Sequence, residues 1–99
     1  MSKQVEFLIH TIFEVWKKYN LGTVNTIALK AGVTRQTVRN VKNGTSTNPK
    51  VLLYMISTIL WELELNSWKK AQDARVTERE VKEDREEVLV IISTLTDLT

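Results

Sequence analysis

Apolar residues recur along this chain at the spacing that places them on one face of a helix. Between residues 5 and 19 they stand three or four positions apart, with polar and charged residues between them. The same period returns over residues 24–31, 35–42 and 50–65, and again over residues 78–95. The β-branched residues fall within this helical spacing, so no strand pattern competes with it. The chain is therefore expected to be all-α.

Turn and capping residues indicate where the first three helices begin and end. Residues 20–22 interrupt the first helix, and the Thr23 side chain is suited to cap the start of the second. A tight break at residues 32–34 separates the second helix from the third. Asn43 and Gly44 end the third helix, because both residue types tolerate the left-handed conformation that often follows a helix.

Two further helices are expected after a polar loop. Pro49 stands where proline favours the start of a helix. Thr77 and Glu80 match the capping-box pattern, which predicts that a last helix begins near Glu78. Residues 66–76 between these helices are polar, and the sequence leaves open whether they continue the fourth helix or form a linker. Five helices are predicted in all.

The fourth helix has two apolar stripes, so it must be covered on two sides. One stripe consists of Leu52, Met55, Ile56, Ile59, Leu60 and Leu63, and the other of Val51, Tyr54, Trp61, Leu65 and Trp68. The last helix has an apolar side made of Val81, Val88, Leu89, Ile92 and Leu95, and Ile91 and Leu98 fall outside it. These surfaces either cover each other within one chain or pair two copies of it, and we expect a homodimer.

Charge is divided unevenly between the two halves of the chain. Residues 1–50 carry a net charge of +6 and residues 51–99 a net charge of −4. No acidic residue occurs between Glu14 and Glu62, although seven Lys and Arg residues do. A stretch of this kind would present phosphate groups with no repelling carboxylate, which favours a nucleic-acid surface.

The segment VNTIALKAGVTRQTVRNVKN, residues 24–43, resembles the lambda-repressor and Cro-like helix-turn-helix family. Ala28 is small where two helices cross closely, and Gly32 supplies the positive φ of the turn. The apolar positions that hold the two helices at a fixed angle are Ile27, Ala31, Val33, Val38 and Val41. The resemblance implies an all-α, five-helix bundle with a lambda-repressor-like core and an additional C-terminal helix.

By this resemblance, the helix around Arg35 to Lys42 enters the major groove of an operator. The residues then expected to contact bases are Thr34, Arg35, Gln36, Arg39 and Asn40, since Arg pairs with guanine and Gln or Asn with adenine. The residues expected to contact the DNA backbone are Thr23, Asn25, Thr37, Lys42, Asn43, Thr45 and Ser46. The chain departs from the family at Val24, where many relatives carry a glutamine.

These patterns divide the chain into a DNA-binding domain over residues 1–65 and an extension over residues 66–99. We expect a sequence-specific transcription regulator, a repressor of phage or bacterial type, whose partner is double-stranded DNA. A second interpretation is an antitoxin-like or adaptor protein whose acidic C-terminal helix binds and inhibits a partner protein. The two interpretations overlap, because antitoxins often keep a DNA-binding module of this kind.

Other classes of function lack the residues they require. The chain has no cysteine and a single histidine, His10, so neither a metal site nor a cofactor is expected. It shows no nucleophile-histidine-acid set and no phosphate-binding glycine loop, so an enzyme is not expected. The carboxylates of residues 78–87 alternate with basic residues, as on a solvated helix. Without an apolar stretch of membrane-spanning length or a signal-peptide pattern, a cytoplasmic protein is expected.

Overall fold

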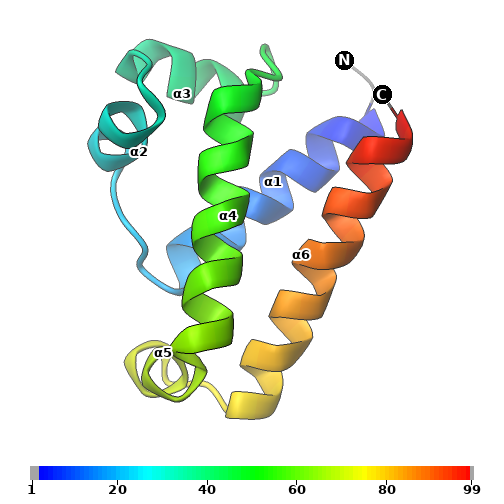
Figure 1. Cartoon of the computed structure of the whole chain (residues 1–99). Coiled ribbons are helices and arrows are strands. Elements are labelled where there is room, and N and C mark those ends of the chain that lie inside the picture. Colours follow the sequence, from blue (N-terminus) through cyan, green and yellow to red (C-terminus); the bar gives the residue numbers. More distant parts are fainter. Residues whose placement is uncertain (1–2, 99) are drawn as a thin grey trace.

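The computed structural model describes residues 3–98, and side chains up to residue 97, as an assembly of helices without strands. The described part contains six helices, which are α1 (Lys3–Lys18), α2 (Val24–Ala31), α3 (Arg35–Lys42), α4 (Pro49–Leu65), α5 (Ser67–Ala74) and α6 (Glu78–Leu98) (Figure 1). The all-α prediction is confirmed over these residues. The prediction of five helices is wrong, because the polar segment after α4 forms a helix of its own.

α5 is short and gives a weak sequence signal because only one of its side chains is buried. Ala71 is buried, whereas Trp68 and Lys69 are exposed. Asn66 ends α4, and its side-chain amide donates to the Glu62 carboxylate at 3.2 Å. Arg75 ends α5 in the left-handed conformation, with φ 57°. The polar segment is thus neither a linker nor a continuation of α4.

The predicted capping residues stand where the helices begin. The Thr23 hydroxyl accepts from the backbone N–H of Thr26 at the start of α2. Pro49 opens α4 after Asn48, whose side chain accepts from two backbone N–H groups. The Thr77 hydroxyl accepts from the backbone N–H of Glu80 at 3.1 Å, as the capping-box pattern predicts. These starts follow from local hydrogen bonding alone.

α4 lies at the centre of the molecule and packs against α1, α2, α5 and α6 (Figure 1). Its most deeply buried side chains recur every four residues and are Val51, Met55, Ile59 and Leu63. They belong to one continuous cluster that draws buried side chains from every helix of the described chain. The expected cover on two sides is only partly present, because Trp61 and Leu65 remain exposed.

α6 lies beside α4 and also contacts α1 and α5, all within one chain. Two sequence-based assignments on this helix are corrected. Ile91, expected outside the apolar side, is buried, whereas Leu89, expected on it, is 48% exposed. The reason is that α6 is covered by α1 as well as by α4, which rotates its buried face toward Ile91. The side chain of Leu98 lies outside the described residues.

A polar cluster joins the end of α1 to α6, and we call it the Asp84 clamp. The Tyr19 hydroxyl donates to the Asp84 carboxylate, and the Lys18 ammonium lies 2.8 Å from the same oxygen. Lys18 also lies 3.4 Å from Glu80. These acids were expected on a solvated helix face, which holds for the exposed Arg79–Glu83 pair but not for Asp84, which is half-buried against α1.

The clamp shifts the pKa of both residues that α1 contributes. Burial raises the pKa of Tyr19 above its ordinary value, and the hydrogen bond to Asp84 and its negative charge raise it further. Burial acts in the opposite direction on Lys18, but the attraction of Asp84 and Glu80 outweighs it, so the pKa of Lys18 is also raised. The folded state therefore holds both protons more firmly than the unfolded chain.

We expect Asp84→Asn to lower the free energy of unfolding at pH 7 by about 1–3 kcal/mol, since a charged hydrogen-bond acceptor is lost from a half-buried site. Urea unfolding followed by circular dichroism measures the change. Glu86→Gln removes an exposed acid from the same helix and serves as the control. Equal stability of the two variants would mean that the clamp does not hold α6 in place.

The clamp also predicts how stability depends on pH. Because both pKa values are raised on folding, the folded state binds more protons than the unfolded chain in alkaline solution. The free energy of unfolding should then fall as the pH rises above about 10, where free Tyr and Lys titrate. The same titration of Asp84→Asn should show a shallower fall. Parallel curves for the two proteins would contradict this assignment.

Candidate nucleic-acid interface

α2 and α3 are joined by a three-residue turn whose conformation the sequence anticipated. Gly32 adopts the left-handed conformation with φ 72°, and its backbone N–H donates to the Ala28 carbonyl. A Cβ atom at Gly32 would meet nothing within 4 Å, so backbone conformation alone favours glycine here. Thr34 then caps α3, because its hydroxyl accepts from the backbone N–H of Thr37 at 3.1 Å.

One face of the α2–α3 pair is held by the core. Ile27, Ala28, Val38 and Val41 are buried, and Ala31 and Val33 are half-buried, as expected for residues that hold two crossing helices. α2 contacts α3 and α4, and α3 also contacts α1. α3 is therefore fixed along one side, and its other side faces outward.

The outward side of α3 carries the residues predicted to contact bases. Thr34, Arg35, Gln36 and Arg39 are exposed, and Asn40 is half-buried. The Gln36 side-chain amide donates to the Asn40 side-chain carbonyl at 2.9 Å, so these two residues form one unit. The carbonyl oxygen of Gln36 and the amide nitrogen of Asn40 keep hydrogen-bonding capacity beyond this bond.

The residues predicted to contact the DNA backbone have mixed environments. Asn25, Lys42 and Asn43 are exposed, in α2, at the end of α3 and directly after it. The other side chains already hydrogen-bond within the chain. The hydroxyls of Thr23 and Ser46 accept from backbone N–H groups. The Thr37 hydroxyl lies 2.9 Å from the Thr34 hydroxyl, and the Thr45 hydroxyl donates to the backbone carbonyl of Asn40. Six of these residues thus lie at the two ends of the α2–α3 pair, whereas Thr37 lies in the first turn of α3, and some of the hydroxyls are already engaged.

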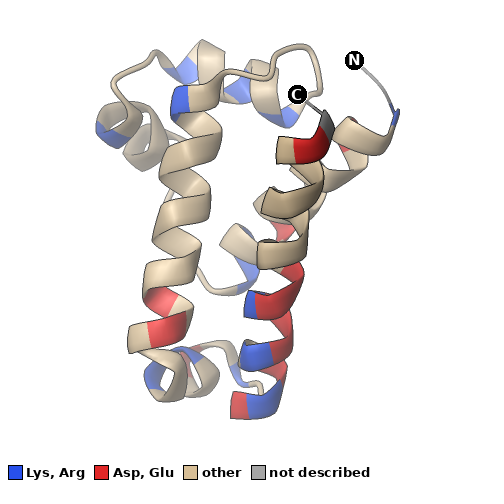
Figure 2. Cartoon of the chain, turned by 45° about the vertical axis from the view of Figure 1, so that its right-hand side comes forward, with Lys and Arg blue, Asp and Glu red and all other residues tan. Residues whose placement is uncertain are grey.

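Charge is segregated along the molecule. Figure 2 shows Lys and Arg but no Asp or Glu on α2, α3 and the start of α4. Asp and Glu gather instead at the far end of α4 and along the first half of α6 (Figure 2). The basic and acidic parts of the sequence therefore lie at different ends of the molecule, and α3 lies at the basic end.

Two acids that sequence spacing did not place near this end modify the picture. A Cβ atom at Gly44 would lie 3.3 Å from the Glu6 side chain, so α1 brings this carboxylate beside the loop after α3. α6 also ends at this end of the molecule, with Asp97 in its last turn (Figure 2). Phosphate contacts are thus favoured on the α2–α3 side of the loop rather than on the side that faces α1.

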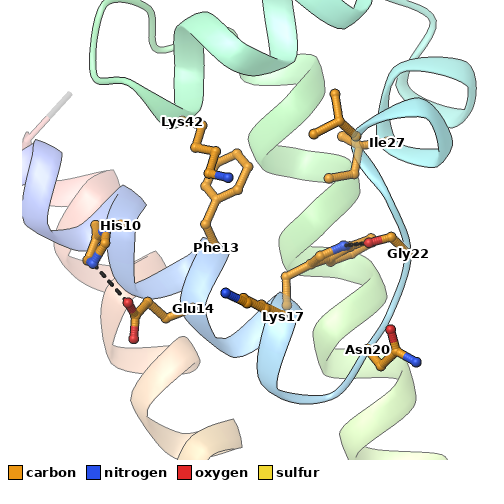
Figure 3. Close-up of a pocket in the computed structure, with 10 residues that line it drawn as sticks. His10, Phe13, Glu14, Lys17, Asn20, Gly22, Ile27 and Lys42 are labelled. Carbon is orange, nitrogen blue, oxygen red and sulfur yellow. Dashed lines mark hydrogen bonds and ion pairs between the residues drawn. The ribbon is translucent and has the colours of Figure 1, made fainter.

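A further basic residue, Lys17 of α1, was not assigned a role from sequence. It lines a hollow together with Lys42 of α3, although 25 positions separate the two in the chain (Figure 3). His10, the single histidine of the chain, also lines this hollow, is exposed and lies 3.0 Å from the Glu14 carboxylate. The helical period relates residues within one helix, so it could not have predicted that Lys17 of α1 and Lys42 of α3 line the same hollow.

The described part of the chain shows neither a metal cluster nor a membrane-spanning helix. Among residues 3–97, no three His, Cys, Asp or Glu side chains are grouped so that they could hold a metal ion. No helix of the described chain combines the length and the apolar character needed to cross a bilayer. Comparison with family models, with curated proteins and with solved structures finds no match to this chain.

Proposed function

We propose that this chain is a sequence-specific DNA-binding transcription regulator, a repressor of phage or bacterial type, that reads an operator with α3. The observation that carries the proposal is the two-sided character of α3. Val38 and Val41 hold one side in the core, while Arg35, Gln36 and Arg39 face outward at the basic end of the molecule. In this proposal α2 and α3 form a helix-turn-helix of the lambda-repressor type.

The outward residues have the chemistry that base recognition requires. Arg35 and Arg39 stand one turn apart, and an Arg side chain donates two hydrogen bonds to O6 and N7 of guanine. Gln36 and Asn40 form a second row, and their paired amides retain both a donor and an acceptor for adenine. Thr34 caps the helix and lies at its N-terminal end, where recognition helices approach the bases.

Contacts to the DNA backbone are proposed from both ends of the α2–α3 pair. Asn25 and Lys42 are exposed and have no recorded partner in the described structure, so they are free to bind phosphate. Asn43 and the following loop offer amides and hydroxyls, including those of Thr45 and Ser46. Val24 stands where many relatives carry a glutamine, and in this proposal no other side chain takes over the role of that glutamine.

An antitoxin-like or adaptor function is the second candidate, and one observation favours it. Leu89 and Val90 of α6 are exposed beside Glu86 and Glu87, which could receive a partner protein. Against this, the Asp84 clamp engages Glu80 and Asp84, two of the seven acids of α6, within the chain. A toxin gene next to this one would favour the second candidate, and a divergent promoter would favour the first.

We also propose that two copies associate through an exposed apolar surface at the corner between α4 and α5. This surface, the corner patch, consists of Trp61, Leu65 and Trp68, which are 63%, 55% and 57% exposed. Glu64 and Lys69 border it with both signs of charge, as a two-fold interface with itself requires. The patch lies toward the end of α4 that is remote from α3, so pairing would leave both recognition helices free (Figure 1).

Selection from random duplex oligonucleotides tests the proposed function. We expect a near-palindromic site whose halves are one helical turn apart, because a symmetric dimer presents two copies of α3. Binding should weaken at least about tenfold between 50 and 200 mM salt, since released counterions supply much of the affinity. No enrichment, or binding that does not change with salt, would refute DNA binding.

Arg35→Ala should weaken binding to the selected site by about 1–3 kcal/mol and relax the preference at one base pair. Fluorescence anisotropy on the selected site and on single-base variants measures both effects. Lys82→Ala removes a cation at an exposed position of α6 and should leave the affinity unchanged. A uniform loss on every sequence would instead assign Arg35 to the phosphate backbone.

Replacing the two tryptophans of the corner patch, Trp61→Ala with Trp68→Ala, should convert a dimer to a monomer at micromolar concentration. Loss of two large aromatic anchors removes much of the energy of such an interface. Analytical ultracentrifugation measures the mass, and Leu29→Ala, at a residue 79% exposed on α2, is the control. A wild-type protein that sediments as a monomer, or a variant that remains dimeric, would contradict the assignment.

A further inference from the structure

A hollow of about 360 Å³ lies between α1 and the α2–α3 pair (Figure 3). Its walls are formed by four apolar side chains, Phe13, Trp16, Val24 and Ile27, and Lys17 and Lys42 also line it. In Figure 3, Lys42 extends from α3 toward α1, where the Phe13 ring and Lys17 lie. A volume of this size is within the range of pockets that bind small organic molecules.

The hydrogen-bonding groups around the hollow leave an excess of positive charge. The Trp16 indole N–H donates to the Gly22 carbonyl at 2.9 Å, so the buried tryptophan has no free donor. The Glu14 carboxylate lies 3.0 Å from His10 and keeps its negative charge, so with His10 neutral at pH 7 the two lysines and Glu14 give the lining a net charge of +1. Lys17 and Lys42 have no ion-pair partner among the described residues. Two ammonium groups therefore remain beside an aromatic and aliphatic surface.

We propose that this hollow binds a small amphipathic carboxylate, with an aromatic ring or a short aliphatic chain against Phe13 and Val24. The carboxylate lies between the ammonium groups of Lys17 and Lys42, which donate charge-assisted hydrogen bonds to it. A simple anion would satisfy the two lysines but leave the half-buried Phe13 and Val24 side chains in contact with water. An uncharged ring would cover the walls and leave both charges unpaired, so the combined ligand fits better than either.

Occupation of this hollow has a consequence that rests on the proposed function. Lys42 ends α3 and is also a candidate phosphate contact, while Val24 begins α2. A carboxylate bound to Lys42 competes with a DNA phosphate for the same ammonium group. The ligand therefore weakens operator binding, and operator DNA weakens ligand binding by the same factor.

Benzoate is a suitable probe because it combines a ring with one carboxylate. Amide chemical shifts of the ¹⁵N-labelled full chain, titrated with benzoate, should change saturably at residues of α1, α2 and the end of α3. Benzyl alcohol and inorganic phosphate should bind about tenfold more weakly than benzoate, since benzyl alcohol lacks the carboxylate and phosphate lacks the ring. Lys17→Ala and Lys42→Ala should each weaken benzoate binding severalfold. Lys30→Ala, at an exposed residue of α2 that does not line the hollow, should leave it unchanged.

Several outcomes overturn the inference without touching the proposed function. No saturable shift with benzoate, or phosphate binding as tight as benzoate binding, would show that the hollow is no carboxylate site. Equal loss in the Lys30→Ala variant would show that only overall charge matters. A competition experiment with the selected operator separates the two proposals: operator binding without benzoate binding refutes the site alone, and benzoate binding without operator binding refutes the proposed function alone.

Discussion

The rest of the structure depends on the burial of a single stripe of α4. Val51, Met55, Ile59 and Leu63 are almost completely removed from water, and each contributes about 1.5–3 kcal/mol of hydrophobic stabilisation. The buried side chains of the other helices collect around this stripe in one cluster, and four helices pack against α4 directly. α2 packs on α4 directly, and α3 is held through α2 and α1.

Because of this packing, α3 has one buried face and one exposed face, and α6 helps to hold α1 and α4 together. The acids of α6 that the Asp84 clamp engages pair with Lys18 at the end of α1, away from the basic end where α3 lies. The hollow between α1 and the α2–α3 pair also arises from this packing, because it lies where three elements meet (Figure 3). A ligand there and DNA on α3 would act on the same short helix.

The apolar residues that remain exposed show where the core is incomplete. Trp61, Leu65 and Trp68 are large side chains that a stable monomer of this size would normally cover. α6 cannot cover them, because α1 and α4 already occupy its buried side. The corner patch therefore follows from the same geometric constraint that places α6, and a second copy of the chain supplies the missing cover in our proposal.

The sequence by itself determined the local features, because each depends on neighbouring residues: the helical period, the caps at Thr23 and Thr77, and the left-handed turn at Gly32. It also placed Val38 and Val41 inside and Arg35 outside on α3. Only tertiary structure decided contacts between distant helices. Three features depend on how the helices pack, which no periodicity encodes. They are the hydrogen bond from Tyr19 to Asp84, the position of Lys17 and Lys42 around one hollow, and the burial of Ile91 in place of Leu89.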